Sequence, residues 1–186
     1  MPLDLSGILC AGAYLCERCG SPKISVLTSV GVIDVELGRG DMRVFFPIAD
    51  GAAPRLRRAD VTLPTEYVKC RFAGAERAVC PTDDIYSAML FGIGEKMSAY
   101  RAFPSGADVD FVRVISKNKL EVRSYERGAG YVTSASGAAA AASVLLALGR
   151  CDANADIAVD CGKMSVHLSD RPCLSASVTR VMTGKT

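Results

Sequence analysis

The sequence predicts an α+β protein made of two similar units, each with an apolar helix packed beneath strands. Residues 137–148 are almost all Ala, Val and Leu, so a helix there has no polar face and must be buried. The same order, a Ser-Gly step followed by a helix and three strands, occurs twice, with Ser6 and Ser136 130 positions apart. With 186 residues, 49% of them hydrophobic, the chain is long enough for one domain or two small lobes.

The first unit is expected to form a helix over residues 7–20 that ends at Gly20, where a left-handed cap is favoured. Alternating apolar residues over 24–37 predict two strands joined by a turn, and residues 42–47 predict a third strand.

Between the units, residues 53–75 predict strands and an arginine-bearing turn. Residues 82–101 predict a helix with Thr82 or Asp83 as its N-cap, because both side chains accept hydrogen bonds from first-turn amides.

The second unit is expected to have its helix over residues 137–148, followed by Gly149 as a left-handed C-terminal cap. Residues 157–168 read as strand, glycine turn and strand, and residues 174–182 as a third strand.

Two further strands, over residues 109–116 and 119–125, are predicted ahead of the second helix, whereas only a few residues precede the first helix. The first unit is therefore expected to be incomplete, with an apolar helix covered on one side only. Soluble monomers rarely expose such a patch. We expect that another chain or a second copy covers it, or that this unit is poorly ordered.

Composition limits the partners and the compartment. The 22 basic and 20 acidic residues nearly balance, and no basic cluster indicates a nucleic-acid partner. The apolar start carries Asp4 and lacks a basic region, so it does not resemble a secretory signal. We expect a cytoplasmic protein without a membrane span. In a reducing compartment, the eight cysteines are interpreted as small hydrophobic residues rather than a disulfide framework.

Neither a metal nor another cofactor is predicted. Cys16 and Cys19 have the spacing of half a zinc site, but there is no second such pair and His167 is the single histidine. Cys10 lies inside the first predicted helix and Cys161 at a hairpin turn, so neither is expected at a helix N-terminus.

The turn before the second helix, with Ser134, Ser136 and Gly137, has two interpretations. Free amides and the positive end of the helix dipole favour a carboxylate or phosphate there. Alternatively, the hydroxyl side chains simply cap the helix.

Several segments resemble the diaminopimelate epimerase family. Glu126-Arg127-Gly128-Ala129-Gly130, followed by a Ser/Thr/Gly turn and an Ala-rich helix, is similar to the family's Glu-Arg-Gly-x-Gly signature, which leads to Cys-Gly-Thr-Gly. Three other segments match in order: Asp4 to Cys10 in the place of Cys-Gly-Asn-Gly-x-x-Cys, Gly74-Ala75-Glu76-Arg77 in the place of Gly-Asn-Pro-His, and Phe103-Pro104 through Asp108 to Phe111 in the place of a Phe-Pro segment ending in Asn-Val and Phe.

The resemblance implies two pseudo-symmetric lobes, each a β-barrel-like sheet around a central helix, with the active site between them. Residues 1–68 would form the incomplete N-terminal lobe and residues 69–186 the C-terminal lobe. It also implies racemisation without a cofactor. Two cysteines face opposite sides of the substrate α-carbon, and the substrate carboxylate lies at the paired helix N-termini.

The family's functional positions carry other residues in this chain. The first thiol position is Asp4, and the second is Ala135 or, with one inserted residue, Ser136. Asp4 and Ser136 are thus the candidate catalytic residues. The candidate substrate-binding residues are Ser6, Gly7, Asp108, Glu126, Arg127 and Gly137, and both Ala75 and Asp108 replace asparagines of the family.

Three functional hypotheses follow. The first is a degenerate epimerase that keeps a cleft for a small amino acid or carboxylate, or that acts as a partner subunit in a homo-oligomer or with another chain. The second is an active isomerase, independent of pyridoxal phosphate, that uses Asp4, Asp108 or Glu126 in place of the thiols. The third is a pure interaction module.

Overall fold

The computed structural model describes residues 3–47, 54–60, 63 and 65–181. It is a mixed α+β fold, as predicted. Its elements in chain order are α1 (Leu5–Cys19), β1 (Lys23–Thr28), β2 (Gly31–Leu37), β3 (Met42–Phe45), β4 (Leu56–Arg58), β5 (Glu66–Phe72), β6 (Ala75–Pro81), α2 (Ala88–Ser98), β7 (Asp108–Ser116), β8 (Lys119–Glu126), β9 (Gly130–Val132), α3 (Ala135–Ala147), β10 (Asn154–Val159), β11 (Gly162–His167) and β12 (Cys173–Ala176).

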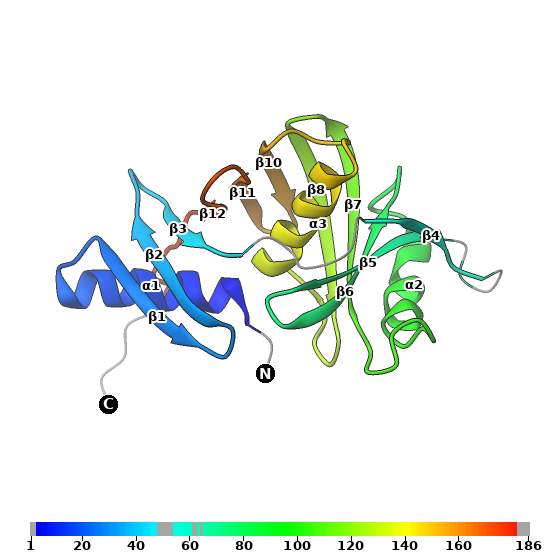
Figure 1. Cartoon of the computed structure of the whole chain (residues 1–186), viewed down its shortest axis with the longest axis horizontal. Coiled ribbons are helices and arrows are strands. Elements are labelled where there is room, and N and C mark those ends of the chain that lie inside the picture. Colours follow the sequence, from blue (N-terminus) through cyan, green and yellow to red (C-terminus); the bar gives the residue numbers. More distant parts are fainter. Residues whose placement is uncertain (1–2, 48–53, 61–62, 64, 182–186) are drawn as a thin grey trace.

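The strands form one 12-stranded sheet in the order β1-β2-β3-β12-β11-β10-β8-β7-β6-β5-β4, and β9 pairs with β8. All pairings are antiparallel except β6 with β7 and β8 with β10, which are parallel. The sheet curves around the helices (Figure 1). α1 packs on β1, β2 and β3, α3 packs on β5 to β8, β10 and β11, and α2 packs on β7 and β8.

The predicted repeat is confirmed, and the structure shows how the two units join. α1 is followed by β1, β2 and β3, and α3 by β10, β11 and β12. The third strands of the units pair with each other, with Met42 opposite Ala176 and Phe45 opposite Cys173. This antiparallel pair merges the two units into a single sheet.

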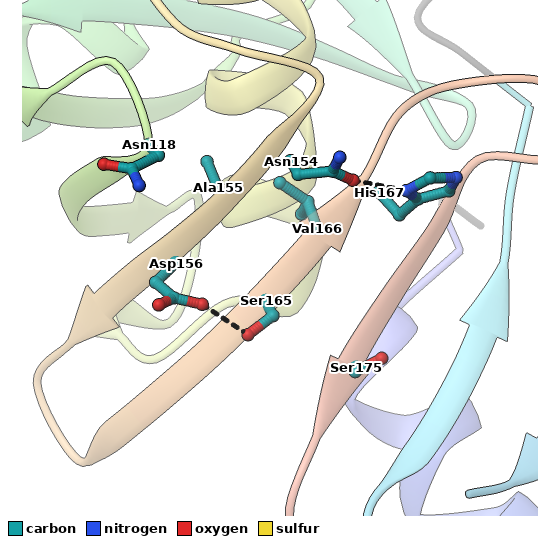
Figure 2. A pocket seen from close by; sticks show the side chains of 8 residues that line it. All are labelled: Asn118, Asn154, Ala155, Asp156, Ser165, Val166, His167 and Ser175. Atoms are coloured by element: carbon teal, nitrogen blue, oxygen red, sulfur yellow. Dashed lines mark hydrogen bonds between the residues drawn. The ribbon is translucent and has the colours of Figure 1, made fainter.

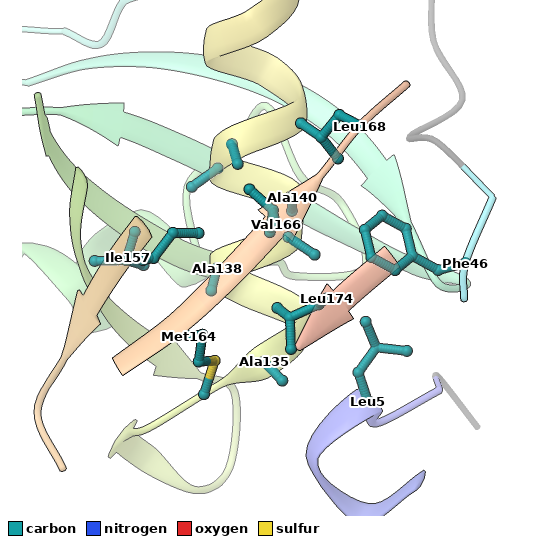
Figure 3. Close-up of a cluster of buried hydrophobic side chains, with 14 of the residues drawn as sticks. Leu5, Phe46, Ala135, Ala138, Ala140, Ile157, Met164, Val166, Leu168 and Leu174 are labelled. Carbon is teal, nitrogen blue, oxygen red and sulfur yellow. The ribbon is translucent and has the colours of Figure 1, made fainter. Parts of the chain in front are cut away.

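α3 is the centre of the main hydrophobic core. Its residues from Ala135 to Leu145 are all buried, because strands surround it. Figure 3 shows Ile157, Val166 and Leu174 of the surrounding strands lying close to its small side chains. Its Ala residues allow this close approach. Among the described residues, no helix combines the length and hydrophobicity that a membrane crossing requires.

α1 is covered on one side, as expected for the incomplete unit. Only Leu5, Leu9, Gly12 and Cys16 are buried, whereas Tyr14 is 52% exposed. Gly12 allows the closest contact with the sheet, because a Cβ at that position would lie 2.5 Å from Cγ1 of Val35.

The middle of the chain differs from the prediction in two ways. β6 was not predicted as a separate strand. α2 begins at Ala88 and not near Asp83, because the Thr82 amide still donates to the Val112 carbonyl and so continues the pairing of β6 with β7. The Asp84 carboxylate then accepts from the Tyr86 amide in a turn that delays the helix.

Two helix ends and one strand end also differ from their predicted positions. α3 has its N-cap at Ser134 and its C-cap at Leu148, and Gly149 follows with a left-handed φ of 68°. β12 ends at Ala176, and the last predicted residue of that strand, Met182, lies outside the described residues, as do Ala53 and Val61 of the middle segment. The proposed boundary after residue 68 stays a prediction.

All eight cysteines are free thiols. Cys16, Cys80, Cys151 and Cys173 are buried, in agreement with their interpretation as small hydrophobic residues. Cys10, Cys19 and Cys161 are exposed.

Gly12 of α1 and Gly92 of α2 provide a matched test of the α1 packing. Gly12→Ala should lower the free energy of unfolding by about 1–3 kcal/mol, because the new methyl group collides with Val35. Gly92→Ala in α2 meets no atom within 4 Å and should stabilise the protein by about 0.5–1 kcal/mol through helix propensity. Urea unfolding of both variants checks this, and equal effects would contradict the close contact of α1 with β2.

Candidate functional site

The N-termini of α1 and α3 meet and cap each other. The Leu5 amide donates to Ser136 Oγ at 3.0 Å, and the Ala135 amide donates to Ser6 Oγ at 3.1 Å. Leu5 and Ala135 are the first residues of their helices, and Ser6 and Ser136 are the second. The two bonds are therefore reciprocal, and they place the predicted site residues Ser6 and Ser136 in one joint between the helices.

Each helix also has its own N-cap, and the two caps are equivalent positions. Asp4 accepts from the Ser6 amide at 2.9 Å and from the Gly7 amide at 3.0 Å. Ser134 accepts from the Gly137 amide at 3.0 Å. Asp4 and Ser134 each stand directly before the first residue of a helix, so Ser134 is the counterpart of Asp4. The alternatives expected from the sequence for this position were Ala135 and Ser136.

Five amides at the two helix N-termini are thus bonded to side-chain oxygens of the chain itself. In a helix these first-turn amides have no partner within the helix and commonly bind anions. In this structure, side chains accept from the amides of Leu5, Ser6, Gly7, Ala135 and Gly137. The helix-cap interpretation therefore describes the observed hydrogen bonds.

A buried group of charges lies beside the N-terminus of α3, on β6, β7 and β8. Arg77 is 2% exposed, and its Nη1 lies 2.8 Å from both carboxylate oxygens of Asp110. Its Nη2 lies 3.3 Å from Asp108 Oδ2 and 3.6 Å from Glu126 Oε1. Ser124 donates to Asp110 Oδ1 at 2.7 Å. We call Asp108, Asp110, Ser124 and Glu126 the carboxylate cluster.

Two contacts connect this cluster to α3. Ser134 Oγ donates to Glu126 Oε1 at 2.6 Å while it caps the helix. Gly137 leaves the space that Asp110 and Ser124 occupy, because a Cβ there would lie 2.2 Å from each of their oxygens. Gly137 is therefore required for packing in addition to its predicted role at the substrate.

The electrostatics of Arg77 are set by its neighbours. Burial alone would lower the pKa of its guanidinium, but Asp110, Asp108 and Glu126 together raise that pKa above its usual value. The guanidinium thus stays charged. Its Nε is buried and has no hydrogen-bond partner among the described residues.

Arg127 is directed away from this joint. Its amide donates to Asp108 Oδ1 at 3.1 Å, and its guanidinium donates to the Ser105 carbonyl and packs against Gly106. Asp4, Ser6, Gly7, Asp108, Glu126, Ser136 and Gly137 are thus gathered around the helix joint and the carboxylate cluster, whereas the Arg127 side chain contacts a neighbouring loop.

Sequence reasoning did not select Arg77, Asp110 or Ser124 as site residues, and it named Ser134 only as part of the anion-binding or capping turn before the second helix. The sequence repeat indicates that Ser134 is the counterpart of Asp4, because the two residues lie 130 positions apart and both are N-caps. Arg77 and Asp110 lie in strands otherwise rich in apolar residues, and a charge in such a strand indicates a buried partner.

The remaining thiols and the histidine do not form a metal centre. Among the described residues, no group of three or more His, Cys, Asp or Glu side chains is arranged to hold a metal ion. Cys161 lies at 2.8 Å from Thr133 Oγ, next to the N-cap of α3, which the sequence did not indicate. Cys10 is exposed on α1.

A separate groove of about 350 Å³ lies on β10, β11 and β12 (Figure 2). Within it, Ser165 donates to Asp156 and His167 contacts Asn154. None of the predicted site residues lines this groove. We therefore place the candidate site at the helix joint.

Sequence comparisons identify relatives among diaminopimelate epimerases. No protein-family model matches the chain. Diaminopimelate epimerase 1 of Nostoc sp. is 29% identical over 204 residues, which cover 97% of this chain and 72% of that protein. The diaminopimelate epimerase of Bacillus cereus is 28% identical over 162 residues, which cover 77% and 56%. The chain therefore spans about half to three quarters of the length of these relatives.

Solved structures agree on the fold. A hydroxyproline epimerase from Agrobacterium vitis with bound trans-4-hydroxy-L-proline has a TM-score of 0.69 at 12% identity, covering 94% of this chain and 64% of that one. A putative phenazine biosynthesis PhzC/PhzF protein from Clostridium difficile has a TM-score of 0.68 at 14% identity, covering 100% and 74%. The expected diaminopimelate-epimerase-like fold is confirmed, and the detail of two separate lobes stays a prediction.

The reciprocal capping can be tested with one serine. Ser136→Ala should lower the free energy of unfolding by about 1–3 kcal/mol, because the Leu5 amide would remain buried without its acceptor. Ser165→Ala, which removes an exposed bond to Asp156, should change it by less than about 0.5 kcal/mol. Chemical denaturation distinguishes the two, and a similar small effect of both variants would show that the cap contributes little.

Proposed function

We propose that this chain, which has a diaminopimelate-epimerase-like fold, does not racemise amino acids by the two-thiol mechanism and instead acts as a partner subunit. The observation that carries the proposal is the self-capped helix joint. The family resemblance expects a substrate carboxylate at the two helix N-termini. In this structure, first-turn amides of the two helices donate instead to side-chain oxygens of Asp4, Ser6, Ser134 and Ser136.

Asp4 acts as an internal anion at α1. Its carboxylate accepts from two amides at the positive end of the helix dipole. A ligand carboxylate would have to displace a group of the same charge that is tethered next to its donors. Such competition favours the resident carboxylate, because its effective concentration is far higher than that of a free ligand.

The chemistry of proton abstraction is also weakened. The two N-cap positions carry a carboxylate and a hydroxyl in place of thiols, and a serine hydroxyl needs an adjacent base to act. The thiols of the partly buried Cys70 and the buried Cys151 cannot substitute, because desolvation raises the pKa of Cys70 to about 12 and that of Cys151 to about 11. At neutral pH these thiols stay protonated and are poor bases.

The alternative function is an active isomerase that uses carboxylates, as expected from the sequence. Its support is the 2.6 Å hydrogen bond from Ser134, the N-cap of α3, to Glu126 at the end of β8, together with the carboxylate of Asp4 at the N-cap of α1. Glu126 could then act as the base for Ser134, and Asp4 as the second proton carrier.

A partner-subunit function agrees with the exposed side of α1. In the second unit the equivalent helix α3 is enclosed by strands, and the exposed Tyr14 of α1 has the buried Val144 as its counterpart. The proposal is that a second copy or another chain associates with this protein, as predicted from the sequence.

Exchange of α-hydrogen for deuterium tests the enzymatic question directly. The purified chain should catalyse no exchange in diaminopimelate, proline or hydroxyproline, followed by NMR in heavy water over hours. Exchange that is lost in Asp4→Ala or Ser134→Ala would reject the proposal in favour of the alternative. Cys161→Ala is the matched control for activity from the one exposed thiol beside α3.

The self-capping predicts that removing Asp4 opens the anion site. In Asp4→Ala the amides of Ser6 and Gly7 lose their acceptor, at a cost of about 0.5–2 kcal/mol in stability. Titration with sodium acetate should then shift the NMR signals of these two amides in the variant and not in the wild type. Equal shifts in both proteins would mean that Asp4 does not occupy the site.

A further inference from the structure

The carboxylate cluster carries an excess of negative charge that Arg77 neutralises in part. Asp108, Asp110 and Glu126 surround one guanidinium, and their side chains are 19%, 0% and 31% exposed. Removing the guanidinium would leave three neighbouring carboxylates, one of them fully buried, without a counter-ion. Unpaired buried charges are strongly destabilising, so the cluster requires a cation.

The geometry of the cluster selects the shape of that cation. One terminal nitrogen of Arg77 bonds both oxygens of Asp110, and the other faces Asp108 and Glu126. The contacts are thus divided between two nitrogens held in one plane. A guanidinium supplies such a fork, whereas an ammonium supplies a single charged nitrogen.

We propose that Arg77 is an internal ligand of the candidate site: its guanidinium occupies a cation site formed by the carboxylate cluster, and that site accepts planar cations of the guanidinium class. Arg77 therefore excludes the ammonium group of an amino acid from Glu126 and Asp108. The inference rests on the proposed function and deepens it, because Asp4 occupies the amides at the N-terminus of α1 and Arg77 occupies the carboxylate cluster.

Two further observations support this assignment. The buried Nε of Arg77 has no hydrogen-bond partner among the described residues. The cluster therefore bonds the two terminal nitrogens of the guanidinium and not the nitrogen that joins it to the side chain. Glu126 and Asp108 are partly exposed, so a small cation can enter the site from solution once Arg77 is shortened.

The test is rescue of Arg77→Ala by free guanidinium. With a dissociation constant of about 1 mM, 10 mM guanidinium chloride should raise the Tm of this variant by about 3–6 °C. The wild type and Arg101→Ala, whose guanidinium is on the surface, should not be stabilised. Methylammonium chloride at the same concentration should raise the Tm of Arg77→Ala by less than about 1 °C. No rescue, or equal rescue by both cations, would overturn the proposal.

A second set of measurements applies if Arg77→Ala does not fold. Its refolding yield from urea should then increase several-fold with 10 mM guanidinium and not with methylammonium, and Arg77→Lys should remain less stable than the wild type. In the wild type, the Nε proton of Arg77 should exchange with water at least tenfold more slowly than that of Arg101. Equally fast exchange would refute the buried internal ligand. These readouts do not depend on α-hydrogen exchange, so either proposal can fail without the other.

Discussion

The hydrogen bonds between the two helix N-termini are the interaction on which the site depends. Leu5 and Ala135 begin helices that lie far apart in the sequence, and each donates to a serine of the other helix. Buried amides must find acceptors, and these serines provide them where solvent or a ligand otherwise would. The joint therefore stabilises the packing of α1 against α3 and at the same time occupies the donors that an anionic ligand would need.

Opposite charges lie close together around this joint. Asp4 lies at the positive end of α1, and Ser134 links the N-cap of α3 to Glu126. Behind Glu126, Arg77 neutralises part of the charge of the carboxylates in a dry environment, where such interactions are strong. Hydrogen bonds, the backbone at Ala135 and the ion pair of Glu126 with Arg77 thus connect the first turn of α1 to the core of the sheet.

The elements that sequence patterns predicted well are those with strong local signals. The apolar helix ending near Gly149 and the alternating strands β1, β2, β10 and β11 were predicted within a few residues. The failures were at β6 and at the start of α2, where strand pairing with Val112 continued past the expected N-cap Thr82. A cap signal is local, but the parallel neighbour that competed with it was not visible in the sequence.

The sequence by itself determined the two repeated units, the burial of α3 and the lack of cysteines in the segments that begin the two helices, because these depend on residue identity and short-range periodicity. Only the tertiary structure decided which serine caps which helix across the joint and that Arg77 fills the carboxylate cluster. The reciprocal caps join residues 131 and 129 positions apart, and Arg77 lies 33 positions from Asp110. They depend on strand register and helix packing, which no local pattern specifies.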